Sequence, residues 1–315
     1  MGGTIVSSHP LRGARLGWLL CLLLAGSAWA GAPGPPEEPV FPESASEETA
    51  APTELPVAST PAPTAPDPRL DWRSLRYKGS AVLGEFDATL TLEPASSARG
   101  WVAQLHTRMR SRLLPDNQAT VRAWFDPATA IVTRFEKLSL GGEPNFKRFH
   151  FREGGVQRFR KEPVRGEDVR RPETWKSERE SFVPFDAASH GCRLISDPGV
   201  LVYLVSSGPG GWDEDPAACV VSGKTLYRVS VHERASGSQE LRYRVQGGDT
   251  PLRAGRVLVT RYEVIGQPVA GEVDEEVTRM DLLVDAETQL PWKVVVREGP
   301  FRVDVQLSDV VLRTP

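Results

Sequence analysis

The sequence has few of the residues that most often carry chemistry. Its 315 residues include three cysteines and five histidines. His106, His150, His190 and His232 stand apart from one another, without the short spacings of zinc ligands. The glycine-rich segment SSGPGG (206–211) lacks a Gly-x-Ser-x-Gly elbow and a following helix signal. We therefore expect no metal ion, no cofactor and neither a serine nucleophile nor a phosphate-binding loop.

Long apolar runs are also absent, except for one at the N-terminus. Arg12 and Arg15 precede an apolar stretch from Leu16 to Ala25, and Ala28-Trp29-Ala30 follows it. This layout predicts a signal peptide over residues 1–30 with cleavage after Ala30, because the apolar stretch is too short to span a bilayer. We expect an exported, periplasmic protein, or alternatively a secreted one, with no transmembrane helix in the mature chain.

Residues 31–68 lack lysine and arginine altogether. They contain eleven prolines and seven acidic residues, and almost no large apolar residue. Such a segment buries too little surface to offset its ordering entropy, so we predict a disordered acidic tether. The remaining residues 69–315 have 36 basic and 34 acidic residues, a net charge of about +2. This balance gives no reason to expect nucleic acid as a partner.

Residues 69–315 show the alternation that is typical of β-strands. Phe301, Val303, Val305 and Leu307 alternate with polar residues, and the segment 101–109 does the same. Strands of this kind have one buried and one solvated face, as in antiparallel sheets. With no second proline-rich break, the pattern predicts one all-β domain over 69–315: a single curved antiparallel sheet or a partly open barrel.

One short helix is expected within this sheet. Asp197 is a suitable N-cap, and Pro198 fits the first helical turn that opens into residues 200–206. The helix is apolar nearly all round, so we expect it to be buried inside the curve of the sheet. The residues expected to be buried are Leu201, Val202, Leu204 and Val205.

Several blocks of the chain resemble a known family. They are LRYKGSAVLGEFDATLTLE (75–93), DPGVLVYLVSSG, GKTLYRVSVHE, GRVLVTRYEVIG and the closing MDLLVDAETQLPWKVVVREGPFRVDVQLSDV. Their order and spacing are similar to those of the exported bacterial family of unknown function numbered 3108, over most of residues 70–312. The resemblance implies a periplasmic curved sheet, similar to the lipoprotein-carrier fold that cradles acyl chains. It implies no particular activity.

The segment ASHGCRLI (188–195) raises the question of an enzyme. A cysteine transpeptidase that acts on peptidoglycan would use Cys192 as its nucleophile, with an upstream histidine as base and an arginine two positions after the cysteine. Here Arg193 follows the cysteine directly, and the upstream candidate base, His150, lies about forty residues away. The enzyme therefore remains the less favoured alternative.

A disulfide is the favoured interpretation of the same cysteine. Once Cys21 is removed with the signal peptide, the mature chain has two cysteines, Cys192 and Cys219. In an oxidising compartment, such a pair predicts a disulfide. Closing this loop is expected to stabilise the fold by about 3 to 4 kcal/mol.

The stretch 146–171 combines nine basic and four acidic residues with several phenylalanines. It fits a patch for anionic lipid headgroups or wall polymers. It also fits a hairpin with a solvated basic face followed by a solvated loop. We favour this second interpretation because mixed charge spread over two faces binds little.

Together these features favour a non-enzymatic exported protein. We expect its curved sheet to bind an apolar or amphipathic envelope component, or a protein partner, in its concavity. One alternative is the cysteine enzyme. Another is a structural or interaction module that pairs a sheet edge with a second chain, for which the strand from Arg256 to Ile265 is a candidate.

Overall fold

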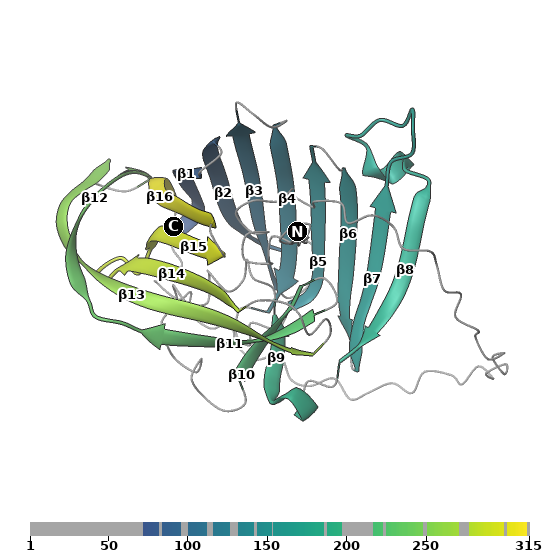
Figure 1. The fold of residues 1–315 in the computed structure, drawn as a ribbon. Coiled ribbons are helices and arrows are strands. Elements are labelled where there is room, and N and C mark those ends of the chain that lie inside the picture. Colours follow the sequence, from purple (N-terminus) through teal and green to yellow (C-terminus); the bar gives the residue numbers. More distant parts are fainter. Residues whose placement is uncertain are drawn as a thin grey trace, which may run out of the picture.

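The computed structural model shows an all-β protein (Figure 1). It describes residues 72–81, 84–95, 100–111, 116–126, 132–141, 144–152, 154–185, 188–196, 217–222, 225–247, 251–270, 277–298 and 301–313. The strands are β1 (Trp72–Ala81), β2 (Gly84–Pro94), β3 (Trp101–Ser111), β4 (Asn117–Phe125), β5 (Val132–Leu140), β6 (Asn145–Arg152), β7 (Gly155–Glu162), β8 (Ser177–Pro184), β9 (Cys192–Ser196), β10 (Ala217–Ser222), β11 (Thr225–Glu233), β12 (Gly237–Gln246), β13 (Leu252–Ala270), β14 (Thr278–Asp285), β15 (Pro291–Glu298) and β16 (Phe301–Leu312). Two short 3-10 turns accompany them, η2 (Pro172–Thr174) and η3 (Ala188–His190).

All the strands described belong to one sheet, which confirms the predicted fold class. The first eight strands form a meander in which each pairs with the next, and the last strand, β16, returns to pair with β1. The order then runs through β15, β14, β13, β11 and β10 to β9. Nearly every pairing is antiparallel, as the alternating sequence predicted.

The C-terminal strands curl until the sheet closes on itself. Strand β13 is 19 residues long, and it pairs with β14 on one side and with β11 and β12 in succession on the other. The end of β12 then pairs in parallel with β16, through Arg244–Gln246 and Asp309–Val311. Strands β12 to β16 thus form a closed ring, visible at the left of Figure 1, while β1 to β8 extend from it as an open sheet. The molecule is a partly open barrel.

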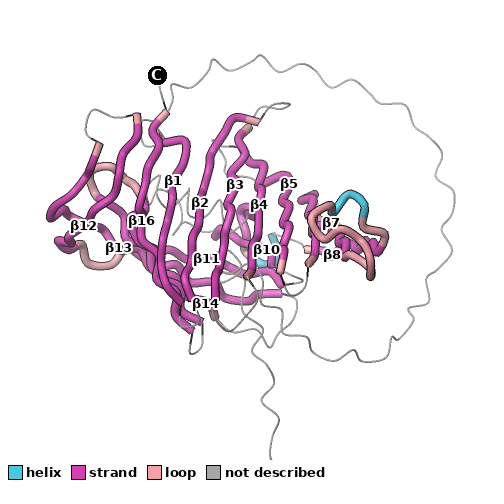
Figure 2. Tube along the Cα trace, turned by 90° about the horizontal axis from the view of Figure 1, so that it is seen from above, coloured by secondary structure: helices cyan, strands magenta, loops and turns pink. Residues whose placement is uncertain are grey.

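The face of the sheet turned towards the core, called the inner face below, is apolar over the ring and β1 to β4. On β2, Phe86, Ala88, Leu90 and Leu92 are buried, whereas the residues between them are not. The predicted alternation in β3 and β16 is present as well, with Ala103 and Val303 among the buried positions. Figure 2, seen from above, shows β12 and β13 at one end of the sheet and β7 and β8 at the other.

Strands β9 and β10 lie side by side in parallel, at one end of the strand order. Parallel neighbours require a crossover connection, which here is the segment 197–216. The predicted helix with Leu201, Val202, Leu204 and Val205 falls in this segment, outside the described residues. The predicted signal peptide and tether also lie outside them.

The expectation that Arg256 to Ile265 forms a sheet edge is wrong. These residues belong to β13, which has strands on both sides. The edges of the described sheet are β8 and β9. Strand β8 carries Glu178, Arg179 and Glu180 in its exposed centre and ends at Pro184, and charges and proline are typical protection for an edge.

Candidate functional site

The structure contains the predicted disulfide between Cys192 and Cys219. The two Cα atoms are 5.6 Å apart, and strands β9 and β10 each contribute one cysteine. Both cysteines are buried in a small apolar cluster with Phe149, Val156 and Phe185, among others. The sulfur that a transpeptidase would use as a thiolate is therefore bonded and enclosed.

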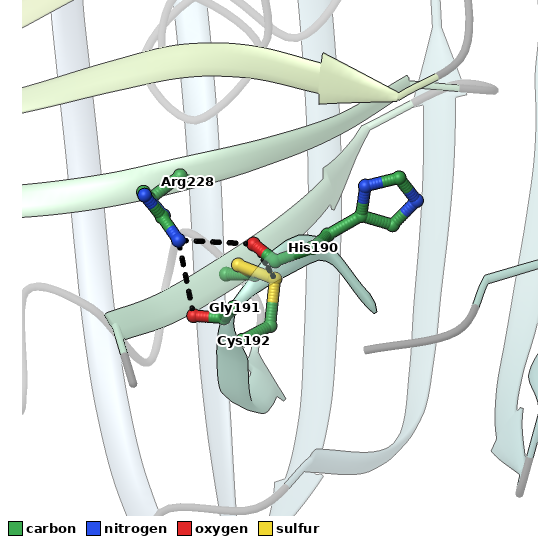
Figure 3. Close-up of a disulfide and its surroundings, with 5 residues drawn as sticks. His190, Gly191, Cys192 and Arg228 are labelled. Atoms are coloured by element: carbon green, nitrogen blue, oxygen red, sulfur yellow. Dashed lines mark hydrogen bonds between the residues drawn. A yellow bond between two sulfur atoms is a disulfide. The ribbon is translucent and has the colours of Figure 1, made fainter. Parts of the chain in front are cut away.

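The turn before Cys192 is held by an arginine from β11. The Nη2 atom of Arg228 donates to the carbonyl oxygens of His190 and Gly191, at 3.1 and 3.5 Å (Figure 3). Gly191 has a φ of +64°, in the left-handed region that favours glycine. In Figure 3, the imidazole of His190 points away from the disulfide. The histidine next to the cysteine is therefore not turned towards it.

His150, the base of the transpeptidase hypothesis, lies on the opposite side of the sheet from Cys192. Its neighbour Phe149 packs in the same cluster as Cys192 on the inner face, and consecutive residues of a strand point to opposite faces. Burial lowers the pKa of His150, and the charges of Arg134 and Arg148 lower it further. The structure does not bring the two residues of the transpeptidase hypothesis together.

Two further findings concern metals and membranes. Within the described ranges, no three or more histidine, cysteine, aspartate or glutamate side chains gather in a way that could hold a metal ion. In the same part of the chain, no helix has the length and apolar character needed to cross a membrane.

A groove lined by described residues lies on the outer face of the sheet, opposite the core. It lies where β12 approaches β1 and β16, and its volume is about 630 Å³, which is in the range of small-molecule sites. Lys78, Arg242 and Arg244 line it, and no acidic side chain does. The other lining residues are Tyr243, Pro251, Leu252, Gln306, Leu307 and Ser308. We call this site the β12–β16 groove.

Strand alternation explains why cations gather there. On β1, Leu75 and Tyr77 are buried in the core, so Lys78 points outward. On β12, Leu241 and Tyr243 are buried, so Arg242 and Arg244 are on the outer side. The parallel pairing of β12 with β16 brings these two outward sets to one place.

A smaller hollow of about 340 Å³ adjoins the groove and shares Arg244 with it. Here the Nε atom of Arg244 donates to Oδ1 of Asp309 at 2.6 Å. Burial pushes the pKa of Asp309 upward, but the hydrogen bonds and charge from Arg244, with Ser308, outweigh burial and hold that pKa below its usual value. Asp309 thus stays ionised and fixes Arg244 at the junction of β12 and β16.

The groove combines positive charge with apolar surface. Lys78 and the two arginines suit a phosphate or carboxylate, and Gln306 and Ser308 add neutral hydrogen-bonding groups. The exposed Pro251 and Leu252 provide apolar contacts beside them. Such a site can hold an anionic head group together with part of an apolar chain.

Sequence reasoning missed this groove entirely. Alternation alone places Lys78 on the wet face of its strand, and does the same for Arg242 and Arg244. However, the lining residues come from positions 78 to 308, and only the pairing of β12 with β16 brings them together. No local signal predicted that pairing.

The basic and aromatic stretch that sequence reasoning singled out forms β6, β7 and the loop before β8. Its basic residues are spread over both faces, as predicted. On the outer face, Arg148 lies over the rings of Phe146 and Phe159, at 5.4 and 5.6 Å. Arg134 lies over Trp124 at 4.6 Å. Here the aromatic rings and cations contact one another.

Comparisons with known proteins add little to this description. No family model and no curated protein sequence match the chain, so the resemblance to family 3108 is not confirmed. Among solved structures, the chain is similar to a beta-barrel-like protein of the domain of unknown function DUF1849 from Brucella abortus. The identity is 9%, the match covers 78% of this chain and 100% of the other, and the TM-score is 0.41.

Proposed function

We propose that this is an exported, non-catalytic binding protein of the cell envelope, and that its ligand is an anionic amphiphile held in the β12–β16 groove. The observation that carries the proposal is the charge of the groove: Lys78 and Arg242 line it, together with Arg244, which is paired with Asp309. Its apolar residues fit the remainder of such a ligand.

The proposal places the ligand on the outer face of the sheet and not in its concavity. The inner face of β1 to β4 consists largely of side chains packed into the core, such as Leu75, Phe86 and Ala123. Two hollows lined by described residues, the β12–β16 groove and its smaller neighbour, lie on the outer face instead.

The apolar lining explains why an amphiphile fits better than a free anion. Lys78 and Arg242 lie on exposed faces of their strands, where a single ion pair contributes at most about 1 kcal/mol. Contacts with the exposed Pro251 and Leu252 would add stabilisation in proportion to the apolar area removed from water. Specificity would come from the cations, and affinity would come from the cations and the apolar contacts together.

Other features of the chain support an exported and non-catalytic role. The N-terminal sequence has the layout of a signal peptide, and a disulfide is typical of oxidising compartments. The disulfide also occupies Cys192, the nucleophile of the alternative enzyme hypothesis.

The test is calorimetric titration with lysophosphatidylglycerol below its micellar concentration, compared with zwitterionic lysophosphatidylcholine. We expect binding of the anionic lipid alone. The double variant Lys78→Gln/Arg242→Gln should weaken it about tenfold or more. The control is Arg152→Gln/Arg165→Gln, which removes two exposed cations far along the strand order from the groove.

Two results would overturn the proposal. One is equal binding of the two lipids, because the cations would then contribute no selectivity. The other is an equal loss of lipid affinity in the groove variant and in the control, because the loss would then follow from the net charge of the protein and not from the groove.

A further inference from the structure

Strand alternation sorts the charges of β5 to β8 onto two different faces. Phe149 contacts Phe135 edge to face on the inner side, and Arg158 stacks on the same ring. Arg148 bonds to Glu136 and stacks on Phe159 on the outer side. These contacts fix the face of every residue in the four strands, because side chains alternate along each of them.

Four cations lie directly opposite one another on the inner face, one on each strand. Lys137 of β5 pairs with Lys147 of β6, Lys147 with Arg160 of β7, and Arg160 with Arg179 of β8. We call these four residues the cationic row. The same line continues through Val121, Leu105 and Leu90 on β4, β3 and β2. The inner face of β5 to β8 therefore carries both the apolar cluster around the disulfide, with Phe149 and Val156, and the cationic row beside it.

The two faces differ sharply in net charge. The inner positions nearest the row add Arg158 and one acidic residue, Glu162, which forms an ion pair with Arg160. The matching outer positions hold three cations and three carboxylates, which form ion pairs with one another or lie nearby: Arg134, Arg148, Lys161, Glu136, Glu178 and Glu180. Among the described strand positions, the excess of positive charge therefore lies on the inner face.

Placing cations opposite one another in a sheet costs stability. Arg160 and Arg179 are exposed, and Lys137 and Lys147 are half-buried. At a strand spacing of about 4.8 Å, the row presents a line of positive charge about 14 Å long. This geometry suits a chain of anionic groups better than a single anion.

We propose that the cationic row binds the acidic segment 31–68 of the same protein. The segment has seven carboxylates and no lysine or arginine, including the pairs Glu37-Glu38 and Glu47-Glu48. It complements the inner face in charge, and it joins the sheet at β1. The interaction is therefore intramolecular and benefits from a high effective concentration.

The segment is long enough to reach the row. Five strand spacings separate β1 from β6, a distance of about 24 Å. Glu48 precedes Trp72 by 24 residues. A fully extended chain of that length spans at most about 80 Å, so Glu47 and Glu48 can reach Lys147.

Zero-length cross-linking of the full chain tests this proposal directly. A carbodiimide joins carboxylates to lysine amines that they touch, and mass spectrometry identifies the linked peptides. In low salt we expect links from segment 31–68 to Lys137 and Lys147 within monomers, at higher yield than to the exposed Lys78 and Lys176. In 0.5 M NaCl these links should be lost, because exposed charges are screened.

Two double variants distinguish an effect of the cationic row from an effect of net charge alone. Arg160→Gln/Arg179→Gln keeps both reporter lysines but removes half of the row, and should lower the yield about fivefold. Arg110→Gln/Arg152→Gln removes two exposed cations outside the row and should leave the yield unchanged. Equal yields for the two variants, links mainly between molecules, or no preference for Lys137 and Lys147 would each overturn the proposal. Lipid binding in the β12–β16 groove involves other residues, so its failure would be recognised separately.

Discussion

At the scale of single residues, Glu136 shows how this sheet accommodates charge. Its side chain is 11% exposed, and Oε1 accepts hydrogen bonds from Nε of Arg134 at 3.1 Å and of Arg148 at 2.7 Å. Burial raises the pKa of Glu136, but the two arginines together outweigh burial and bring that pKa below its ordinary value of 4.5. The carboxylate therefore contributes stability only while it is ionised.

The variant Glu136→Gln should reveal this contribution through its pH dependence. Because the folded-state pKa is lowered, the stabilisation is present above about pH 4.5 and is lost as pH falls through the folded-state value. We expect a loss of about 1–2 kcal/mol at pH 7, allowing for the exposure of both arginines. Urea unfolding from pH 7 to pH 3 measures it, with Glu240→Gln as an exposed control. A deficit that stays constant over this range would contradict the account.

Gly191 is a residue for which both conformation and space require glycine. Gly191→Ala would place a Cβ atom in a left-handed conformation and against the guanidinium of Arg228. Gly154→Ala is the matched control, since Gly154 also has a positive φ of +78° but has nothing near its Cβ position. We expect the control to cost about 1 kcal/mol and Gly191→Ala about 1–2 kcal/mol more. Equal losses in urea unfolding would show that Arg228 does not constrain this turn.

At the scale of elements, the disulfide holds the parallel pair β9 and β10 at the edge of the sheet. This pair contributes only short strands, and the crossover between them is 20 residues long. Replacing both Cys192 and Cys219 by serine should lower the free energy of unfolding by about 2–4 kcal/mol.

Hydrogen exchange should locate this effect. In the double serine variant, or after reduction, amides of β9 and β10 should exchange faster than the loss of global stability alone explains. Amides of β2 and β3 should accelerate by no more than that loss. Uniform acceleration over all strands would mean that the disulfide stabilises the whole sheet and not this pair.

The elements also show what the sequence could and could not predict. Period-two alternation identified strands such as β16, because the burial of Val303 and Val305 is a local property of the chain. The cysteine pair predicted the disulfide. The interior position of β13 was predicted wrongly, because alternation tells which face is buried but not which strands lie on either side.

Predicting the candidate site would have required knowing which strands lie next to one another. Arg242 and Arg244 alternate with buried residues, as many solvated strand residues do. They became part of a groove only because β12 leaves β13 and joins β16, a contact between residues 65 positions apart. In the same way, Lys137 and Arg179 form one row through three successive strand pairings. Neither arrangement has a signature in a short stretch of sequence.

At the scale of the whole molecule, the sheet has two regions with different characters. The ring of β12 to β16 closes the sheet and creates the groove on its outer face, whereas β5 to β8 extend away from the ring (Figure 1). On their inner face, β5 to β8 carry the cationic row beside the smaller apolar cluster. The account gives each region a separate anionic partner: an amphiphile for the groove and the chain's own acidic segment for the row.

The most direct test of the central claim is to identify what the protein carries when it is isolated from its native envelope. Native mass spectrometry and lipid extraction should be applied to the wild type, to Lys78→Gln/Arg242→Gln and to the control Arg152→Gln/Arg165→Gln. The account predicts an anionic amphiphile bound to the wild type and the control, and lost from the groove variant. Equal retention by all three proteins, or no amphiphile on the wild type, would contradict it.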